Sequence, residues 1–533
     1  MKPILSKQSL TIWVLIIPVF LAACAGPQAT AGAIQIEILA DGNSHALGIP
    51  SGFTVQQALD AAGVQLGTLD RVDPPVYTLL TEGSLVTVYR VSERFEIQEI
   101  VIPFDRQMIR NEALPEGETH LLQPGVNGLQ EITYRILDEE GAETSRTPVK
   151  NTLVVEPIPE IVMIGVQTAF TPLPIEGRLA YVSGGNAWLL QGNTSNRRPL
   201  VLSGDLDGRI AKLSNDGEWF LFTRHREDAD ETINSLWAIS TIDPEAEPID
   251  LQATNIVHFA DWVPTSTSLA AVYSSVEPST APPGWQANNN LIEVPLTSSG
   301  RVLRSRILLE ANAGGQYGWW GTTFTWGYDA DHLAYARADS IGIVNLNDGT
   351  LEPLHEITPY QTLSEWAWVP GLAWGHDNRT LFFVDHGAPL GLENPGASPI
   401  FDLIAFLSRD NLVLPLATRT GMFAYPSVSP AVENPNGEIQ YKIAYYQSIA
   451  PLESVDSGYR LKVIDRDGSN SRELFPAPGE PGLLPQNVRL VWSPGADLIG
   501  VLYRGDLWLV DVLTGIGQRV TGDGQTLNYD WKP

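Results

Sequence analysis

A short-strand unit that recurs through residues 178–533 is the feature that most constrains this fold. Its clearest copy is residues 487–521, NVRLVWSPGADLIGVLYRGDLWLVDVLTGIGQRVT. This copy holds a first strand stopped by Pro494, an apolar second strand, a third (DLWLVD) that alternates polar and apolar residues, and a short fourth. One sheet of four short strands cannot enclose a core, so the repetition predicts an architecture of stacked copies.

Looser copies of the unit have equivalent positions 39 to 64 residues apart, which is the spacing of propeller blades with loops of variable length. These positions are Ser214, Trp262, Trp326, Trp374, Ser429, Trp492 and Trp531. Residues 178–203 supply only later strands of a copy, at residues 179–182, 187–191 and 199–202, whereas residues 527–531 supply a first strand and then stop. We therefore expect the two ends to share one blade and close a β-propeller. The count is seven blades, or six if a weaker copy is an insertion.

The sequence WSPG followed by DLWLVD resembles the TolB-like and WD-type propeller repeats. That resemblance implies a disc with a polar central channel and faces built from loops. Such discs serve as platforms for protein or ligand partners, but the fold alone does not decide the partner.

The N-terminus has the pattern of an export signal. Lys2 and Lys7 precede an apolar run at residues 10–21, which is as long as a signal-peptide core and short for a transmembrane helix. The run ends in LAAC at Cys24, which resembles a bacterial lipobox. The resemblance implies a signal peptide at residues 1–23, a lipid on Cys24 that anchors the chain to the outward face of the bacterial cell membrane, and a tether at residues 24–33.

Cys24 is the only cysteine in the chain, so it cannot form an internal disulfide and a lipid-bearing role explains it better. An incidental cysteine in an ordinary signal peptide is the alternative.

Residues 34–91 predict a small β-grasp domain. Residues 34–39 alternate as a strand, residues 45–49 return as its hairpin partner, and residues 85–91 form a further strand. Between them, TVQQ beginning at Thr54 predicts a helix that starts with a capping box, and Gly63 stops it. The phrase TVQQALDAAGVQLG resembles the ubiquitin-like domain found in front of G-five domains in cell-wall proteins, including resuscitation-promoting factors.

Residues 92–166 carry fourteen acidic and six basic residues and have no long apolar run, which predicts an elongated, thin β-sheet with little core. The segments IPF, LPEG, PGVNG and TSR resemble the G-five domain family. The glycines that match the family are Gly117, Gly125, Gly128, Gly141 and Gly165. We expect glycine at these points because it permits positive φ in turns.

The G-five resemblance implies extracellular binding or spacing, and N-acetylglucosamine binding has been proposed for the family. Phe104 and Tyr134 are the aromatic candidates for stacking on a sugar, and the alternative is that they pack the single apolar layer. Residues 167–177, rich in proline, predict a stiff linker to the propeller at residues 178–533.

Motifs for catalysis are missing from the sequence. It contains no G-x-S-x-G, no Gly-Lys dipeptide for a phosphate loop, and Pro359 stands where a zinc-protease motif beginning at His355 requires its second histidine. We therefore predict no catalytic residue and no cofactor.

Two groups of residues remain as binding candidates. Asp465, Asp467 and Asn470 have calcium-loop spacing, but no glutamate completes the loop, and a glycine turn between outer strands explains them equally. The second group is aromatic and consists of Trp319, Trp320, Trp366 and Trp368, with the last two on one face of a predicted strand. They suit stacking on carbohydrate or protein contact, or they pack blade against blade.

The formal charge of −29, from 33 Lys and Arg against 62 Asp and Glu, argues against nucleic acid as a partner. The combined prediction is a mainly β, non-enzymatic, lipid-anchored envelope protein that binds peptidoglycan or another glycan through its G-five stalk and an envelope protein or saccharide through its propeller. The competing hypotheses are a propeller-type glycan lyase or hydrolase and a purely structural spacer.

Overall fold

The computed structural model describes residues 32–111, 117–165, 171–226, 232–264, 268–433, 439–484 and 490–533. The chain divides into two compact units, one of residues 1–107 and 121–161 and the other of residues 108–120 and 162–533. Within the described ranges, no helix has the length and apolar character needed to cross a membrane.

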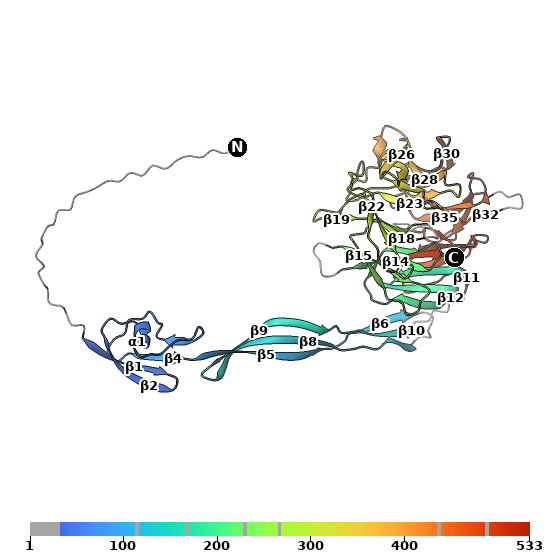
Figure 1. Cartoon of the computed structure of the whole chain (residues 1–533). Coiled ribbons are helices and arrows are strands. Elements are labelled where there is room, and N and C mark those ends of the chain that lie inside the picture. The colour runs from blue at the N-terminus through green and yellow to red at the C-terminus, as the bar shows by residue number, and fades with distance from the viewer. Residues whose placement is uncertain are drawn as a thin grey trace, which may run out of the picture. The chain divides into compact units, whose positions relative to one another are not determined.

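The first folded part is a mixed sheet that packs on one helix (Figure 1). The helix α1 begins with the predicted capping box, in which Thr54 accepts from the Gln57 backbone N–H and Gln57 accepts from the Thr54 N–H. Gly63 follows the helix with φ +72°, as expected for a stop signal. The elements are β1 (Ala33–Ala40), β2 (Asn43–Pro50), α1 (Val55–Ala61), β3 (Arg71–Asp73) and β4 (Leu85–Tyr89), in the sheet order β2-β1-β4-β3.

The predicted strand over residues 85–91 is interrupted at Arg90. At this residue the backbone leaves one sheet and enters the next, and the Arg90 guanidinium binds Asp41 at 2.7 Å and Asp70 at 2.6 Å. These contacts join the first sheet to the start of β5. The short strand β3 was not predicted from the sequence.

A long three-stranded antiparallel sheet follows, formed by β5 (Val91–Ile102), β8 (Gly128–Glu139) and β9 (Ala142–Val155) in the order β5-β8-β9. Of the described residues in these strands, only Gly128 and Ile136 are buried, which confirms a thin sheet with little core. The hairpin turn between β8 and β9 lies at Glu140 and Gly141, both with positive φ. A second sheet has the order β6-β10-β7, with β6 (Arg106–Asn111), β7 (Thr119–Gln123) and β10 (Glu160–Gly165).

Four of the five matched glycines have one of two structural reasons. Gly117 and Gly141 adopt positive φ, as predicted. The prediction is wrong for Gly125 and Gly128, which do not have positive φ but allow close approach. A Cβ on Gly125 would lie 2.3 Å from the Phe104 ring, and one on Gly128 would lie 2.7 Å from the Val155 carbonyl oxygen. Gly165 exchanges backbone hydrogen bonds with residues 117 and 118.

The described part of residues 171–533 contains six four-stranded antiparallel sheets, each built from strands in chain order. They match the predicted repeating unit and resemble propeller blades. The first three sheets comprise β13 (Leu206–Leu213), β14 (Trp219–His225), β15 (Asn234–Ser240) and β16 (Ile249–Thr254); β17 (Phe259–Trp262), β18 (Leu269–Ser274), β21 (Leu291–Leu296) and β22 (Arg306–Leu309); and β23 (Thr323–Trp326), β24 (Leu333–Ala336), β25 (Ser340–Asn345) and β26 (Thr350–Glu356).

The next three sheets comprise β27 (Leu372–Trp374), β28 (Thr380–His386), β29 (Phe401–Leu407) and β30 (Leu412–Ala417); β31 (Ser427–Val428), β34 (Lys442–Ser448), β35 (Tyr459–Asp465) and β36 (Arg472–Phe475); and β37 (Val491–Trp492), β38 (Leu498–Tyr503), β39 (Asp506–Asp511) and β40 (Gly517–Arg519). Small additions are β19 (Val276–Pro278) with β20 (Trp285–Ala287), β32 (Val432–Glu433) with β33 (Ile439–Gln440), and the 3-10 turns Pro395–Ala397 and Pro451–Glu453.

A further sheet combines strands from both ends of this region. β41 (Thr526–Lys532) pairs antiparallel with β11 (Pro174–Ser183), and β12 (Asn186–Val201) lies on the other side of β11. Figure 1 shows the C-terminus beside β11. Two boundaries differ from the prediction. Residues 174–177 belong to β11 and not to the linker, and residues 199–202 are not a separate strand, because β12 continues to Val201.

The repeated tryptophans connect neighbouring sheets. Trp262, Trp374 and Trp492 end the first strands of their sheets, and each donates its indole N–H to a backbone carbonyl in the first strand of the preceding sheet, at 2.9 to 3.1 Å. The acceptors are Lys212, Thr325 and Ser427. A recurring indole at this position therefore buries a large ring and satisfies a carbonyl of the adjacent sheet.

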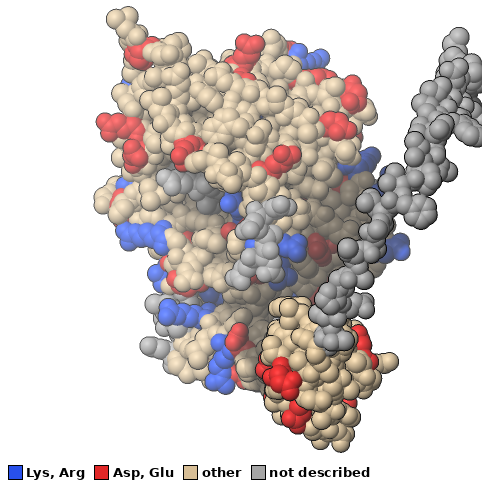
Figure 2. All heavy atoms as spheres, turned by 90° about the vertical axis from the view of Figure 1, so that its left-hand side faces the viewer, with Lys and Arg blue, Asp and Glu red and all other residues tan. Residues whose placement is uncertain are grey.

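The surface carries both signs of charge. Figure 2 shows both acidic and basic side chains among other residues on the face in view. Over the whole sequence, Asp and Glu outnumber Lys and Arg.

Candidate functional site

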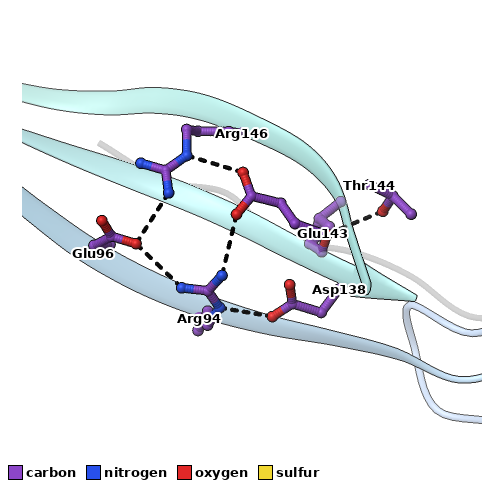
Figure 3. Close-up of polar contacts among 7 residues, drawn as sticks. Arg94, Glu96, Asp138, Glu143, Thr144 and Arg146 are labelled. Atoms are coloured by element: carbon purple, nitrogen blue, oxygen red, sulfur yellow. Dashed lines mark hydrogen bonds and ion pairs between the residues drawn. The ribbon is translucent and has the colours of Figure 1, made fainter. Parts of the chain in front are cut away.

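One face of the β5-β8-β9 sheet carries a closed network of ion pairs (Figure 3). Arg94 binds Asp138 at 2.7 Å, Glu96 at 3.2 Å and Glu143 at 3.2 Å. Arg146 binds Glu143 at 2.9 Å and Glu96 at 3.1 Å. The register places Arg94 and Arg146 on either side of Ile136, so the network lies over the buried isoleucine of the sheet.

The charges within this network satisfy one another. The hydrogen bond from Arg146 lowers the pKa of Glu143, and the hydrogen bond to Asp138 raises the pKa of Arg94. Every member is partly exposed, so each pair contributes little free energy. The network covers Ile136 and orders the strands.

The structure places the predicted sugar-stacking residues Tyr134 and Phe104 against other groups. The Arg146 guanidinium lies 5.3 Å from the centre of the half-buried Tyr134 ring. The Phe104 ring lies against the Cα of Gly125, and its backbone N–H donates to Asn127 at 3.1 Å. These contacts favour the packing alternative for both residues.

The opposite face of the same sheet exposes an aromatic ring that sequence reasoning missed. Phe95 is 62% exposed, and Ile97 and Val101, two and six residues further along β5, are also exposed. Phe95 pairs across the sheet with Arg135, and Ile97 pairs with Thr133, so polar side chains flank the apolar strip. The signal for this exposed strip was available in the sequence. Every second residue from 93 to 101 (Glu, Phe, Ile, Glu, Val) points to the same face of the strand, and three of these five side chains are apolar.

Trp319 and Trp320 belong to an aromatic cluster. Trp320 lies 5.9 Å from Trp319, 5.5 Å from Trp285 and 5.6 Å from His258 between ring centres, and the Arg209 guanidinium lies 5.5 Å from the Trp285 ring. All three tryptophans are half-buried. Sequence reasoning did not find Trp285, His258 or Arg209, because they lie 34 to 111 residues away from Trp319 and Trp320 in the chain.

His258 is the most perturbed titratable group of this cluster. Burial and the nearby charge of Arg209 lower its pKa to about 4, so the imidazole is neutral at physiological pH. Its Nε2 atom is buried without a hydrogen-bond partner among the described residues.

Trp366 and Trp368 are not on a strand, and this prediction is wrong. They lie in the connection between β26 and β27, where no described strand pairs with them. Trp368 is buried, donates its indole N–H to the Met422 carbonyl at 2.9 Å and lies 4.9 Å from Phe401. Trp366 is half-buried, 6.3 Å from Phe423. The alternation of Trp and Ala here reflects packing of a loop, which favours the packing alternative.

The calcium candidate is a turn between β35 and β36 whose oxygens already have partners. Asp465 accepts from Lys442 at 2.5 Å and from the Asn470 amide at 2.6 Å, and Asp467 accepts from Ser469. Gly468 has φ +83°, as the turn alternative requires. The described residues hold no group of three His, Cys, Asp or Glu side chains suited to a metal ion. Cys24 and the lipobox lie outside the described residues.

Comparison with known proteins identifies the front part of the chain. Residues 93–167 match the G5 domain, and residues 36–76 match the G5-linked ubiquitin-like domain. Both resemblances found in the sequence are thereby confirmed.

Curated relatives include the resuscitation-promoting factor RpfB of Mycolicibacterium smegmatis, 25% identical over 33% of this chain and 49% of the relative. Rpf2 of Corynebacterium glutamicum is 26% identical over 27% of this chain and 37% of the relative. The chain thus spans about half or less of the length of these relatives. Among solved structures, a prolyl endopeptidase aligns with 66% of this chain over 49% of its own chain, with 14% identity and a TM-score of 0.42.

Proposed function

We propose that this chain, a G5 domain protein related to resuscitation-promoting factors and continued by blade-like sheets, is a non-enzymatic cell-envelope protein that binds cell-wall glycan. The lipid on Cys24 would hold it to the outward face of the cell membrane. The two domain matches at residues 36–76 and 93–167 and the similarity to resuscitation-promoting factors support a role at the cell wall.

The observation that carries the glycan proposal is the exposed Phe95 on the thin β5-β8-β9 sheet. Sugars bind aromatic rings through their apolar faces and bind neighbouring polar groups through their hydroxyls. Phe95 offers such a ring, and Arg135 and Thr133 lie across from it and from Ile97 on the adjacent strand. N-acetylglucosamine units of peptidoglycan are the proposed ligand.

We further propose that the sheets of residues 174–533 form a closed seven-bladed ring that serves as a partner platform. The pairing of β41 with β11 supports closure, because it joins the last strand of the chain to the first strand of this region. Further support comes from contacts of β41 with both neighbouring sheets. Asp530 accepts from the Leu213 N–H at 2.9 Å, and Tyr529 donates to the Gly500 carbonyl at 2.5 Å.

The test of glycan binding is co-sedimentation of the full chain, solubilised in detergent, with purified peptidoglycan. We expect the chain to pellet, and Phe95→Ser to weaken binding about fivefold to tenfold, the equivalent of about 1–1.4 kcal/mol for one stacked ring. Tyr77→Ser is the matched control, because Tyr77 is an aromatic residue in the same unit that is 79% exposed.

Two outcomes would contradict this function. A chain that pellets no more than a control protein would exclude glycan binding and favour a protein partner or a spacer. Soluble sugar fragments released from the peptidoglycan would favour the alternative of a propeller-type lyase or hydrolase.

A further inference from the structure

Five loops around two adjacent sheets emerge on the same side. Successive strands of each sheet are antiparallel, so the loop from the second to the third strand and the loop from the fourth strand to the next sheet leave from the same ends of the strands. Around the sheets that begin with β27 and β31, these loops are residues 357–371, 387–400, 418–426, 449–458 and, in its described part, 476–484. We name them the leucine loops.

The leucine loops display large apolar side chains to solvent. Leu363 is 95% exposed and adopts φ +53°, a conformation that costs energy for a bulky residue. The other exposed apolar side chains of these loops are Leu390, Leu392, Ile449, Leu452 and Leu484. Apolar side chains gathered on one side of a domain mark an interaction surface.

Hydrogen bonds connect the leucine loops into one layer. The Gln361 N–H donates to the Gly396 carbonyl at 2.7 Å, which links the first two loops. Met422 of the third loop accepts from Trp368 of the first and donates its own N–H to Ser454 of the fourth at 3.3 Å. Tyr459, at the start of β35 directly after the fourth loop, exchanges two backbone hydrogen bonds of 2.8 Å with Leu483 of the fifth loop.

Proline stiffens the same layer. The described part of the leucine loops contains Pro359, Pro370, Pro389, Pro395, Pro399, Pro426, Pro451, Pro476, Pro478 and Pro481. A surface stiffened in this way loses little conformational entropy when a partner binds.

The charge of the leucine loops is mainly negative. In their described part they carry one cation, Arg419, and five carboxylates, Glu365, Glu393, Glu453, Asp456 and Glu480. Arg460 lies next to them in β35, but its guanidinium donates to the carbonyls of Pro476, Ala477 and Glu480 and so is used within the layer. Arg419, in the third loop, is exposed, and five carboxylates against this one guanidinium leave the described part of the loops acidic.

We propose that the leucine loops bind a cationic protein segment that inserts apolar side chains between the exposed leucines and pairs its Lys or Arg with the surrounding carboxylates. An anionic lipid surface would be repelled by these carboxylates. This inference rests on the proposed platform role of residues 174–533 and is independent of glycan binding by the G5 domain.

The test uses the full chain in phosphatidylcholine nanodiscs and a fluorescein-labelled peptide of three Lys-Leu-Lys-Pro repeats. We expect the peptide to bind, and the matching peptide of Glu-Leu-Glu-Pro repeats to bind at least tenfold more weakly. The double variant Leu363→Ser/Leu392→Ser should weaken binding of the lysine peptide at least fivefold. Glu365→Gln/Glu453→Gln should weaken it and reduce its dependence on salt.

The matched control is Leu513→Ser. Leu513 is 78% exposed but lies in the turn between β39 and β40, at the opposite ends of the strands from the leucine loops. It should leave binding unchanged, as should Phe95→Ser. Equal thermal unfolding midpoints of all variants would show that each is folded. Loss of peptide binding with retained peptidoglycan binding would separate this surface from the G5 function.

Three results would overturn the proposal. They are no binding of the lysine peptide, equal binding of both peptides, and an equal effect of Leu513→Ser and the double variant. A dye attached at Leu392→Cys distinguishes a lipid surface from a protein partner. Its emission should shift to the blue only when the lysine peptide is added, and a shift in nanodiscs without peptide would favour lipid instead.

Discussion

Trp531→Ala tests how far the last strand stabilises the whole region of blade-like sheets. Trp531 is buried in β41, and its indole N–H donates to the Glu176 carbonyl at 2.7 Å. β41 pairs with β11 from Arg178 opposite Lys532 to Ser183 opposite Thr526. Replacing a buried tryptophan with alanine leaves a cavity and an unpaired carbonyl, which costs about 3–5 kcal/mol of unfolding free energy.

The assay is urea unfolding of the full chain, followed by circular dichroism and analysed by linear extrapolation. Leu527→Ala is the matched control, because Leu527 lies in the same strand but is exposed, and it should cost less than about 1 kcal/mol. A loss below about 1 kcal/mol for Trp531→Ala, or equal losses for both variants, would refute the idea that burial of this strand stabilises the region.

Three further predictions concern pH, packing and anchoring. The pKa of His258 is lowered to about 4 from 6.5, so the unfolded chain binds the proton first as pH falls. Stability should therefore drop between about pH 6.5 and pH 4, by about 2 kcal/mol at pH 5 relative to pH 7.5, and His258→Gln should flatten the profile in urea unfolding. Gly125→Ala places a methyl group against the Phe104 ring and should cost about 1–3 kcal/mol, whereas Gly48→Ala, which meets only the flexible Gln35 side chain, should cost much less on thermal unfolding. Cys24→Ser should move the protein from the membrane fraction to the soluble fraction on immunoblots, and unchanged membrane retention would contradict the lipobox.

The sequence predicted those features that depend on neighbouring residues. It predicted the capping box of Thr54 and Gln57 and the positive φ of Gly141, because each involves residues at most three apart in the chain. The repeating strands were found for the same reason, because alternation and Pro or Gly punctuation are written into each short segment.

Patterns that resemble a strand without a partner misled the prediction. The alternation around Trp366 and Trp368 suggested a strand, but a strand requires hydrogen bonds to a neighbour, and none of the described strands lies beside them. Gly125 and Gly128 also depend on distant contacts. Each must be glycine because another part of the chain packs against its Cα, and the local sequence does not reveal that contact.

The sequence by itself determined the repeating unit, the front domains and the missing first strand that residues 527–531 supply, because each is a local pattern or a repetition of one. Only the tertiary structure decided which aromatic rings are buried and which apolar side chains remain in solvent. Phe95 is exposed while Trp368 is enclosed, and the leucine loops form one layer from segments up to about 120 residues apart. Burial depends on contacts between distant segments, and such contacts exist only once the chain has folded.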